Sequence, residues 1–160
     1  MARCKIIKTA PTLFVHMGIF HWVKVRLFCY ATEDEEKLHD LIVNVAGTDE
    51  VDAEISDGHH GNQMIIFSAD LKKDAECRSL FQRLGKDIVN ELIANVNERV
   101  DDDCTFYLRI DKQAAVLGRY VIAHHGDVIS ITCKIASHPA RKELAVKNML
   151  EFLRSAEALL

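Results

Sequence analysis

Apolar and polar residues alternate along several stretches of this chain, a pattern typical of strands with one buried face. The first stretch runs from about Val15 to Ala31, and Val23, Val25 and Leu27 fall on its apolar side. Similar stretches at 51–56, 63–71, 104–111, 118–123 and 127–136 predict five more strands. The segment 57–62, Asp-Gly-His-His-Gly-Asn, has the composition of a turn between two of them.

Apolar residues at helical spacing predict the helices between these strands. Thr32 and Glu35 form a capping-box pattern that opens a helix, and Gly47 is a natural end for it. A longer helix is predicted from about Asp74 through Val96, and a helical turn at 112–117. Pro139 is predicted in the first turn of a final helix.

The resulting order is β-α-β-β-α-β-β-β-α, with hairpins in place of repeated βαβ units. This order predicts an α+β two-layer sandwich, in which helices cover one face of a largely antiparallel sheet. The other face of the sheet then stays open. The polar side of the strands assigns the following residues to it: Trp22, Lys24, Arg26, Phe28, Tyr30, Tyr107, Arg109, Ser130, Thr132 and Lys134.

Length and composition predict a single domain over residues 1–160. The chain has 160 residues, 49% of them hydrophobic, and no linker rich in Pro, Gly or Ser divides it. About residues 1–13 are expected to be an N-terminal extension. We expect no membrane segment, because no apolar run approaches about 18 residues, and no signal peptide. Five scattered cysteines without a C-x-x-C pair predict a reducing, cytoplasmic setting.

Charge is distributed unevenly, although the net charge is only −4. Residues 1–26 carry five Lys or Arg and no acidic residue, whereas 33–57 carry ten Asp or Glu against Lys37 alone. A protein of this kind can present a basic surface while its total charge is negative. The acidic segment itself is better explained as a solvated helix and strand.

Aromatic and basic residues are interleaved on the predicted open face, and this is the main functional feature. Bases of single-stranded or irregular RNA stack on rings, while cations meet the phosphates. Arg26, Arg109 and Lys112 are the candidate phosphate contacts, and Tyr107 or Trp22 the candidate stacking residue. The same composition also suits a protein–protein or dimer surface, and a plain solvated sheet remains a third interpretation.

Two His-His-Gly segments, at 59–61 and 124–126, suggest a joint metal site if their bends meet. Adjacent His residues in an extended chain point to opposite sides, so ordinary turn chemistry or ligand contact is the stronger interpretation. No metal or other cofactor is predicted.

The run Asp101-Asp102-Asp103 is the remaining candidate for catalysis, since clustered carboxylates can hold Mg²⁺ in a phosphodiesterase. No second acidic motif accompanies it, and a polar loop explains it better. No catalytic nucleophile, P-loop or G-x-G-x-x-G pattern is present in the right context. We therefore predict a protein that is not an enzyme.

Three motifs together resemble one archaeal family, described as a predicted exosome subunit or RNA-binding protein. The motifs are Phe-Cys-Tyr-Ala-Thr-Glu-Asp-Glu-Glu at 28–36, Asp-Gly-His-His-Gly-Asn at 57–62, and Arg-Val-Asp-Asp-Asp at 99–103 continued by Tyr-Leu-Arg-Ile-Asp-Lys-Gln-Ala-Ala at 107–115. They stand in the family's order and spacing, and the resemblance covers roughly residues 14–155.

The resemblance implies a fold like that of the large-subunit ribosomal protein that binds 5S RNA. It also implies RNA as a partner, a role as an accessory of a multi-subunit RNA-processing complex, and an acidic segment 33–57 directed away from RNA. Sheet and motif together give these predicted RNA-binding residues: Trp22, Lys24, Arg26, His59, His60, Asn62, Tyr107, Arg109, Lys112 and Gln113. RNA preference and oligomeric state, a dimer included, stay open.

Overall fold

The computed structural model describes residues 18–124 and 126–160, and five strands within them form one sheet. The strand order is β2-β3-β1-β5-β4, and every neighbouring pair is antiparallel. The strands are β1 (Phe20–Cys29), β2 (Asp52–Asp57), β3 (Gln63–Leu71), β4 (Thr105–Asp111) and β5 (Val128–Ile135). The predicted extension at 1–13 lies outside the described residues, as does the start of the first predicted strand.

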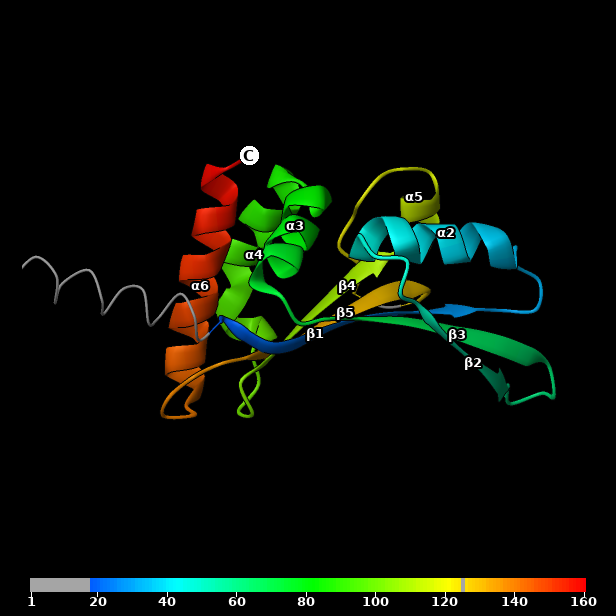
Figure 1. Cartoon of the computed structure of the whole chain (residues 1–160), viewed down its shortest axis with the longest axis horizontal. Coiled ribbons are helices and arrows are strands. Elements are labelled where there is room, and N and C mark those ends of the chain that lie inside the picture. Colours follow the sequence, from blue (N-terminus) through cyan, green and yellow to red (C-terminus); the bar gives the residue numbers. More distant parts are fainter. Residues whose placement is uncertain (1–17, 125) are drawn as a thin grey trace, which may run out of the picture.

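The helices gather over one face of this sheet. They are α2 (Glu35–Ala46), α3 (Asp74–Leu84), α4 (Lys86–Arg99), α5 (Lys112–Val116) and α6 (Lys142–Ala158). Helices α2 and α5 lie over one end of the sheet, while α3, α4 and α6 pack together at the other (Figure 1). The prediction of an α+β sandwich with one open sheet face is confirmed.

The core lies between the helices and the inner side of the strands. Val23, Val25 and Leu27 of β1 are buried there, and so are Ile129 and Ile131 of β5. Four phenylalanines close the end under α3 and α6, with ring centroids 5.0–6.5 Å apart: Phe20, Phe81, Phe106 and Phe152. Because the strand period is two, burying this set exposes the alternate set on the opposite face.

Two helix boundaries differ from the sequence prediction. Helix α2 is capped by Asp34, whose carboxylate accepts from the Lys37 N–H at 3.1 Å, and not by Thr32. The single long helix predicted from Asp74 is two helices, because Gly85 between them adopts a φ of +95°. A residue with that φ cannot continue an α-helix, and glycine adopts it without strain.

The C-terminal third holds two further corrections. The strand predicted at 118–123 is reduced to one bridge, between Ile122 and Ile110. There the Asp111 N–H donates to the Val121 carbonyl and the Ala123 N–H to the Arg109 carbonyl, both at 2.8 Å. This segment partly covers the outer edge of β4. The last helix begins at Lys142, after the turn that contains Pro139, and not at Pro139 itself.

Candidate functional site

The open face of β1, β5 and β4 carries half of the predicted RNA-binding residues: Trp22, Lys24, Arg26, Tyr107 and Arg109. Lys24 lies opposite Thr132, which lies opposite Tyr107, and in the next row Arg26, Ser130 and Arg109 are aligned. Directly opposed residues of antiparallel strands project to the same face. Trp22 shares this face one row further along, opposite Lys134.

Within these two rows the middle strand, β5, carries only the small side chains of Ser130 and Thr132, while longer cationic and aromatic side chains lie on both flanks. With strands about 4.8 Å apart, the Cα atoms of Arg26 and Arg109 are roughly 10 Å apart across β5. We call this surface, made of Trp22, Lys24, Arg26, Tyr107, Arg109, Ser130, Thr132 and Lys134, the open-face channel.

Two arginines give the open-face channel its free positive charge. The Arg26 guanidinium lies 5.3 Å from the centre of the Phe28 ring, and neither it nor Arg109 forms an ion pair within the part of the chain that the structure describes. Lys24 pairs with Asp70 at 3.7 Å, but both side chains are about half exposed, so this pair is weak. Lys134 donates to the carbonyl of Asp103.

Tyr107 is anchored by a hydrogen bond to the acidic loop before β4. Its hydroxyl donates to Asp101 at 3.0 Å, and the other Asp101 oxygen accepts from the backbone N–H groups of Asp103 and Thr105, both at 2.9 Å. Partial burial opposes ionisation of Asp101, but these three donors still hold its pKa below the usual range. The same hydrogen bond raises the pKa of Tyr107. The aspartate run therefore organises a loop, as the polar-loop interpretation predicts.

Acidic residues border the channel on one side, which corrects part of the expectation for segment 33–57. Helix α2, which holds its first acidic cluster, lies on the opposite face of the sheet (Figure 1). However, Asp52 and Glu54 of β2 are opposite Ser68 and Ile66 of β3 and therefore share the open face. Positive charge on β1 and β4 thus gives way to negative charge at the β2 edge.

The Gly-His-His-Gly turn joins the open face at the end of β1. A cavity of about 390 Å³ lies there, lined among others by Phe28, Tyr30, His59, His60, Asn62 and Met64. The two imidazoles line it together, with ring centroids 6.2 Å apart. Adjacent His residues point to opposite sides in an extended chain, but these two lie in the predicted turn, where both can line one cavity.

Glycine shapes this turn for a physical reason. The Gly58 N–H donates to the Asn62 carbonyl at 2.8 Å, and a Cβ on Gly58 would lie 2.8 Å from that same oxygen. Gly61 has a φ of +78° and donates back to the Gly58 carbonyl at 3.0 Å. A side chain at the first position would collide with backbone, and one at the second would be strained.

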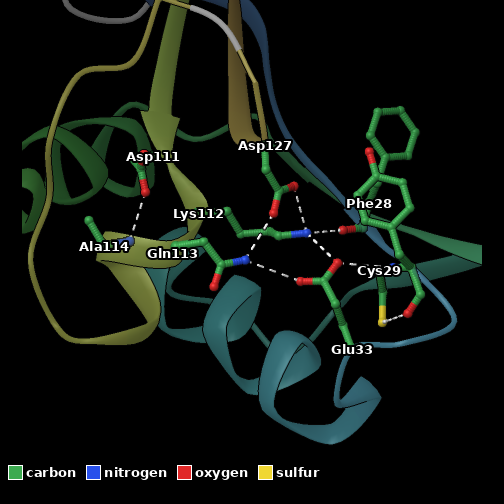
Figure 2. Close-up of polar contacts among 9 residues, drawn as sticks. Phe28, Cys29, Glu33, Asp111, Lys112, Gln113, Ala114 and Asp127 are labelled. Carbon is green, nitrogen blue, oxygen red and sulfur yellow. Dashed lines mark hydrogen bonds and ion pairs between the residues drawn. The ribbon is translucent and has the colours of Figure 1, made fainter.

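Lys112 does not belong to any surface, and its prediction as a phosphate contact is wrong. Its side chain is fully buried, and its ammonium donates to the Phe28 carbonyl at 2.6 Å, to Glu33 at 2.7 Å and to Asp127 at 2.8 Å (Figure 2). It also lies 4.9 Å from the centre of the Tyr30 ring. An ammonium so fully surrounded has no position left for a phosphate.

Gln113 belongs to the same cluster. Its amide donates to Asp127 at 3.0 Å and reaches Glu33 at 3.5 Å (Figure 2). Together these contacts tie the start of α5 to the segment before α2 and to the segment before β5. We call these four residues the lysine cluster: Glu33, Lys112, Gln113 and Asp127. The cluster has a structural role and supports Tyr30, which lines the cavity. The motif residues Lys112 and Gln113 are therefore not brought to the open-face channel.

Phe28 and Tyr30 line the cavity and are predicted on the open face, but they are not among the predicted RNA-binding residues. The alternation that continues from Trp22 to Tyr30 is the signal that could add them. The lysine cluster left no local signal, since its members come from three separate segments.

Other site classes find no support in the described residues. Within 18–124 and 126–160 there is no group of three or more His, Cys, Asp or Glu side chains that could hold a metal ion. None of the helices in these ranges is long and apolar enough to cross a membrane. Four cysteines in the described residues are buried and form no disulfide: Cys29, Cys77, Cys104 and Cys133.

A protein-family model described as RNA binding matches residues 22–135, which contain β2 to β5, β1 from Trp22 onward, and the residues that line the cavity. The chain belongs to this family. The family assignment agrees with the RNA-binding part of the resemblance drawn from the three motifs.

Relatives in archaea support the assignment. The chain is 31% identical over 147 residues to RNA-binding protein PAB1135 of Pyrococcus abyssi, with 86% of this chain and 96% of that protein covered. It is 28% identical over 142 residues to protein MJ0213 of Methanocaldococcus jannaschii, with 80% and 93% covered. The structure of Mth689, a DUF54 protein from Methanothermobacter thermautotrophicus, superposes with a TM-score of 0.71 at 28% identity, covering 84% of this chain and 98% of that one.

Proposed function

We propose that this protein binds single-stranded or irregular RNA on the open-face channel and does not act on it chemically. The observation that carries the proposal is the alignment of Lys24, Arg26 and Arg109 with Tyr107 on one uncovered face of the sheet. The family match and the similarity to RNA-binding protein PAB1135 of Pyrococcus abyssi support it.

Two kinds of contact hold RNA on this surface. Free guanidinium groups on both flanks of β5 meet phosphates, and arginine suits them because its planar donors are fixed in a fork. Two exposed rings offer stacking faces to bases: that of Tyr107, which is anchored by its hydrogen bond to Asp101, and that of Trp22. Since the acidic β2 edge repels phosphate, the RNA backbone runs over β1, β5 and β4.

A salt titration of binding to a single-stranded oligoribonucleotide tests this proposal. Three phosphate contacts, at Lys24, Arg26 and Arg109, predict a slope of log affinity against log salt of about −2. Affinity then falls roughly 20-fold between 50 and 200 mM salt. No binding at low salt, or affinity independent of salt, would refute the proposal.

A matched pair of variants locates the surface. Arg26→Gln with Arg109→Gln removes two charges from the open-face channel, and the slope should fall to about −0.7. Lys147→Gln with Arg154→Gln removes the same charge from exposed positions on α6, over the helical side of the molecule. That control should leave the slope unchanged. Equal losses in both variants would mean that net charge, and not this surface, governs binding.

We further propose, from the motif resemblance, that the protein acts as an accessory of a multi-subunit RNA-processing or RNA-degrading complex such as the exosome. From the same resemblance we propose that the fold is like that of the large-subunit ribosomal protein that binds 5S RNA. Co-purification of exosome subunits with the tagged protein, retained after ribonuclease treatment, is the expected result. Loss of every subunit after ribonuclease treatment would show that RNA alone links them.

A further inference from the structure

We propose that the cavity beside the Gly-His-His-Gly turn receives one unpaired nucleobase of the bound RNA. The inference rests on the proposed RNA binding and adds to it a defined site for a single base. It concerns a different surface element from the open-face channel, namely the end of β1 and the turn between β2 and β3.

The lining of the cavity has the chemistry that a nucleobase needs. Phe28, Tyr30 and Met64 offer apolar and aromatic surface for the flat faces of a base. Asn62, His59 and His60 bring amide and imidazole groups that pair with the polar edges of a base. The volume of about 390 Å³ lies within the range of small-molecule sites. No acidic residue is among the described residues that line it.

The cavity is continuous with the open-face channel. Phe28 follows Arg26 by two positions on β1, so both project from the same face. The Arg26 guanidinium lies 5.3 Å from the centre of the Phe28 ring. A phosphate held by Arg26 therefore lies beside the mouth of the cavity, and the base attached next to it can leave the stack and enter.

The cavity walls are fixed from behind. Lys112 lies against the Tyr30 ring at 4.9 Å and is itself held by the Phe28 carbonyl, Glu33 and Asp127. On the opposite side, the hydrogen bond between Gly58 and Asn62 fixes the turn that carries the two imidazoles. A wall that is already ordered binds a ligand without the entropy cost of ordering it.

These features favour RNA that is single-stranded where it crosses the end of β1. A base inside a helix is paired and stacked, and removing it costs several hydrogen bonds and stacking contacts. An unpaired base incurs least of that cost. The inferred ligand class is therefore a single-stranded segment, or a loop or bulge, with one base turned out of the stack.

An abasic scan tests the inference with the unmodified protein. One base at a time is removed from a short single-stranded oligoribonucleotide of defined binding register, while every phosphate is kept. We expect one position to weaken binding by about 5- to 150-fold, the range for loss of one stacked base. The other positions above the open-face channel should each have smaller effects.

Variants assign that position to the cavity. Tyr30→Leu and Asn62→Ala change exposed lining residues, and each should weaken binding to intact RNA while leaving the salt slope unchanged. With the sensitive base already removed, neither variant should weaken binding further. Ile55→Ala is the matched control, because Ile55 is exposed on the same hairpin and does not line the cavity.

The outcomes separate this inference from the proposed function. Salt-dependent binding by the wild-type protein with no sensitive position, or with Tyr30→Leu and Asn62→Ala unchanged, overturns the cavity inference alone. A sensitive position that keeps its full effect in both variants also overturns it, because the base then lies elsewhere. No RNA binding at low salt overturns both. Binding of a protein partner through the cavity, with RNA bound normally in its presence, counts against a base site.

Discussion

Replacing Lys112 by Met is the sharpest test of the corrected role of this residue. The substitution keeps a long, unbranched side chain of similar shape but removes the ammonium from the lysine cluster. In the native protein, that ammonium is fully buried and donates to three oxygens at 2.6–2.8 Å. Its loss leaves Glu33 and Asp127 facing each other without a cation between them.

The expected loss of stability follows from these contacts. Hydrogen bonds to charged groups contribute roughly 1.5–3 kcal/mol each, and removing one partner of a buried ion pair costs about 3–5 kcal/mol of stability. The carboxylates are 18% and 32% exposed, so water partly replaces the ammonium, and we expect about 3 kcal/mol. That is a large share of the roughly 5–15 kcal/mol by which domains are stable.

Urea unfolding at neutral pH measures this loss as a shift of the midpoint at constant slope. The triple variant Lys112→Met, Glu33→Gln, Asp127→Asn is the control, since it removes the unpaired negative charges as well. It should recover about 1 kcal/mol or more of the lost stability. A loss below about 1 kcal/mol for Lys112→Met alone would refute the buried cluster and restore the surface role.

Three further predictions follow from the geometry. The pKa of Asp101 is lower in the folded than in the unfolded protein, so its contribution to stability is present above about pH 4 and is lost as the pH falls through the lowered pKa. Asp101→Asn should therefore reduce the loss of stability at acid pH in an unfolding profile. It should also bring the raised pKa of Tyr107 back down in an ultraviolet titration. Asp52→Asn with Glu54→Gln should strengthen RNA binding at low salt and not at high salt, because both carboxylates border the channel; unchanged affinity at low salt contradicts this. Gly58→Ala should lower the free energy of unfolding in urea by about 1–3 kcal/mol, since the added Cβ would lie 2.8 Å from the Asn62 carbonyl oxygen. Gly126→Ala is the comparison, because Gly126 has a positive φ but an added Cβ there meets no atom within 4 Å, so it tests backbone strain without a collision.

The sheet and its open face could be predicted from sequence because strand alternation is a local signal. The residues from Trp22 to Tyr30 and from Phe106 to Arg109 show which side is buried without reference to any other part of the chain. When β5 pairs with both β1 and β4, the register of the two pairings places Arg26 and Arg109 in one row across the sheet.

The lysine cluster and the cavity could not be predicted in the same way. Lys112 lies 79 residues from Glu33 in sequence, and its polar neighbours in the motif made an exposed position the simpler prediction. The turn that carries the two imidazoles could be predicted from its composition, but the approach of Phe28, Tyr30 and Met64 that completes the cavity could not. The Gly85 break was missed because apolar spacing continues on both sides of it.

Backbone amide chemical-shift mapping with a short single-stranded oligoribonucleotide tests the central claim most directly. The account predicts that shifts at low salt are confined to the outer-face positions of β1, β5 and β4 and to residues 58–62, and that they fade as salt is raised. Shifts concentrated on α3, α4 and α6, or no shifts at all at low salt, would contradict it.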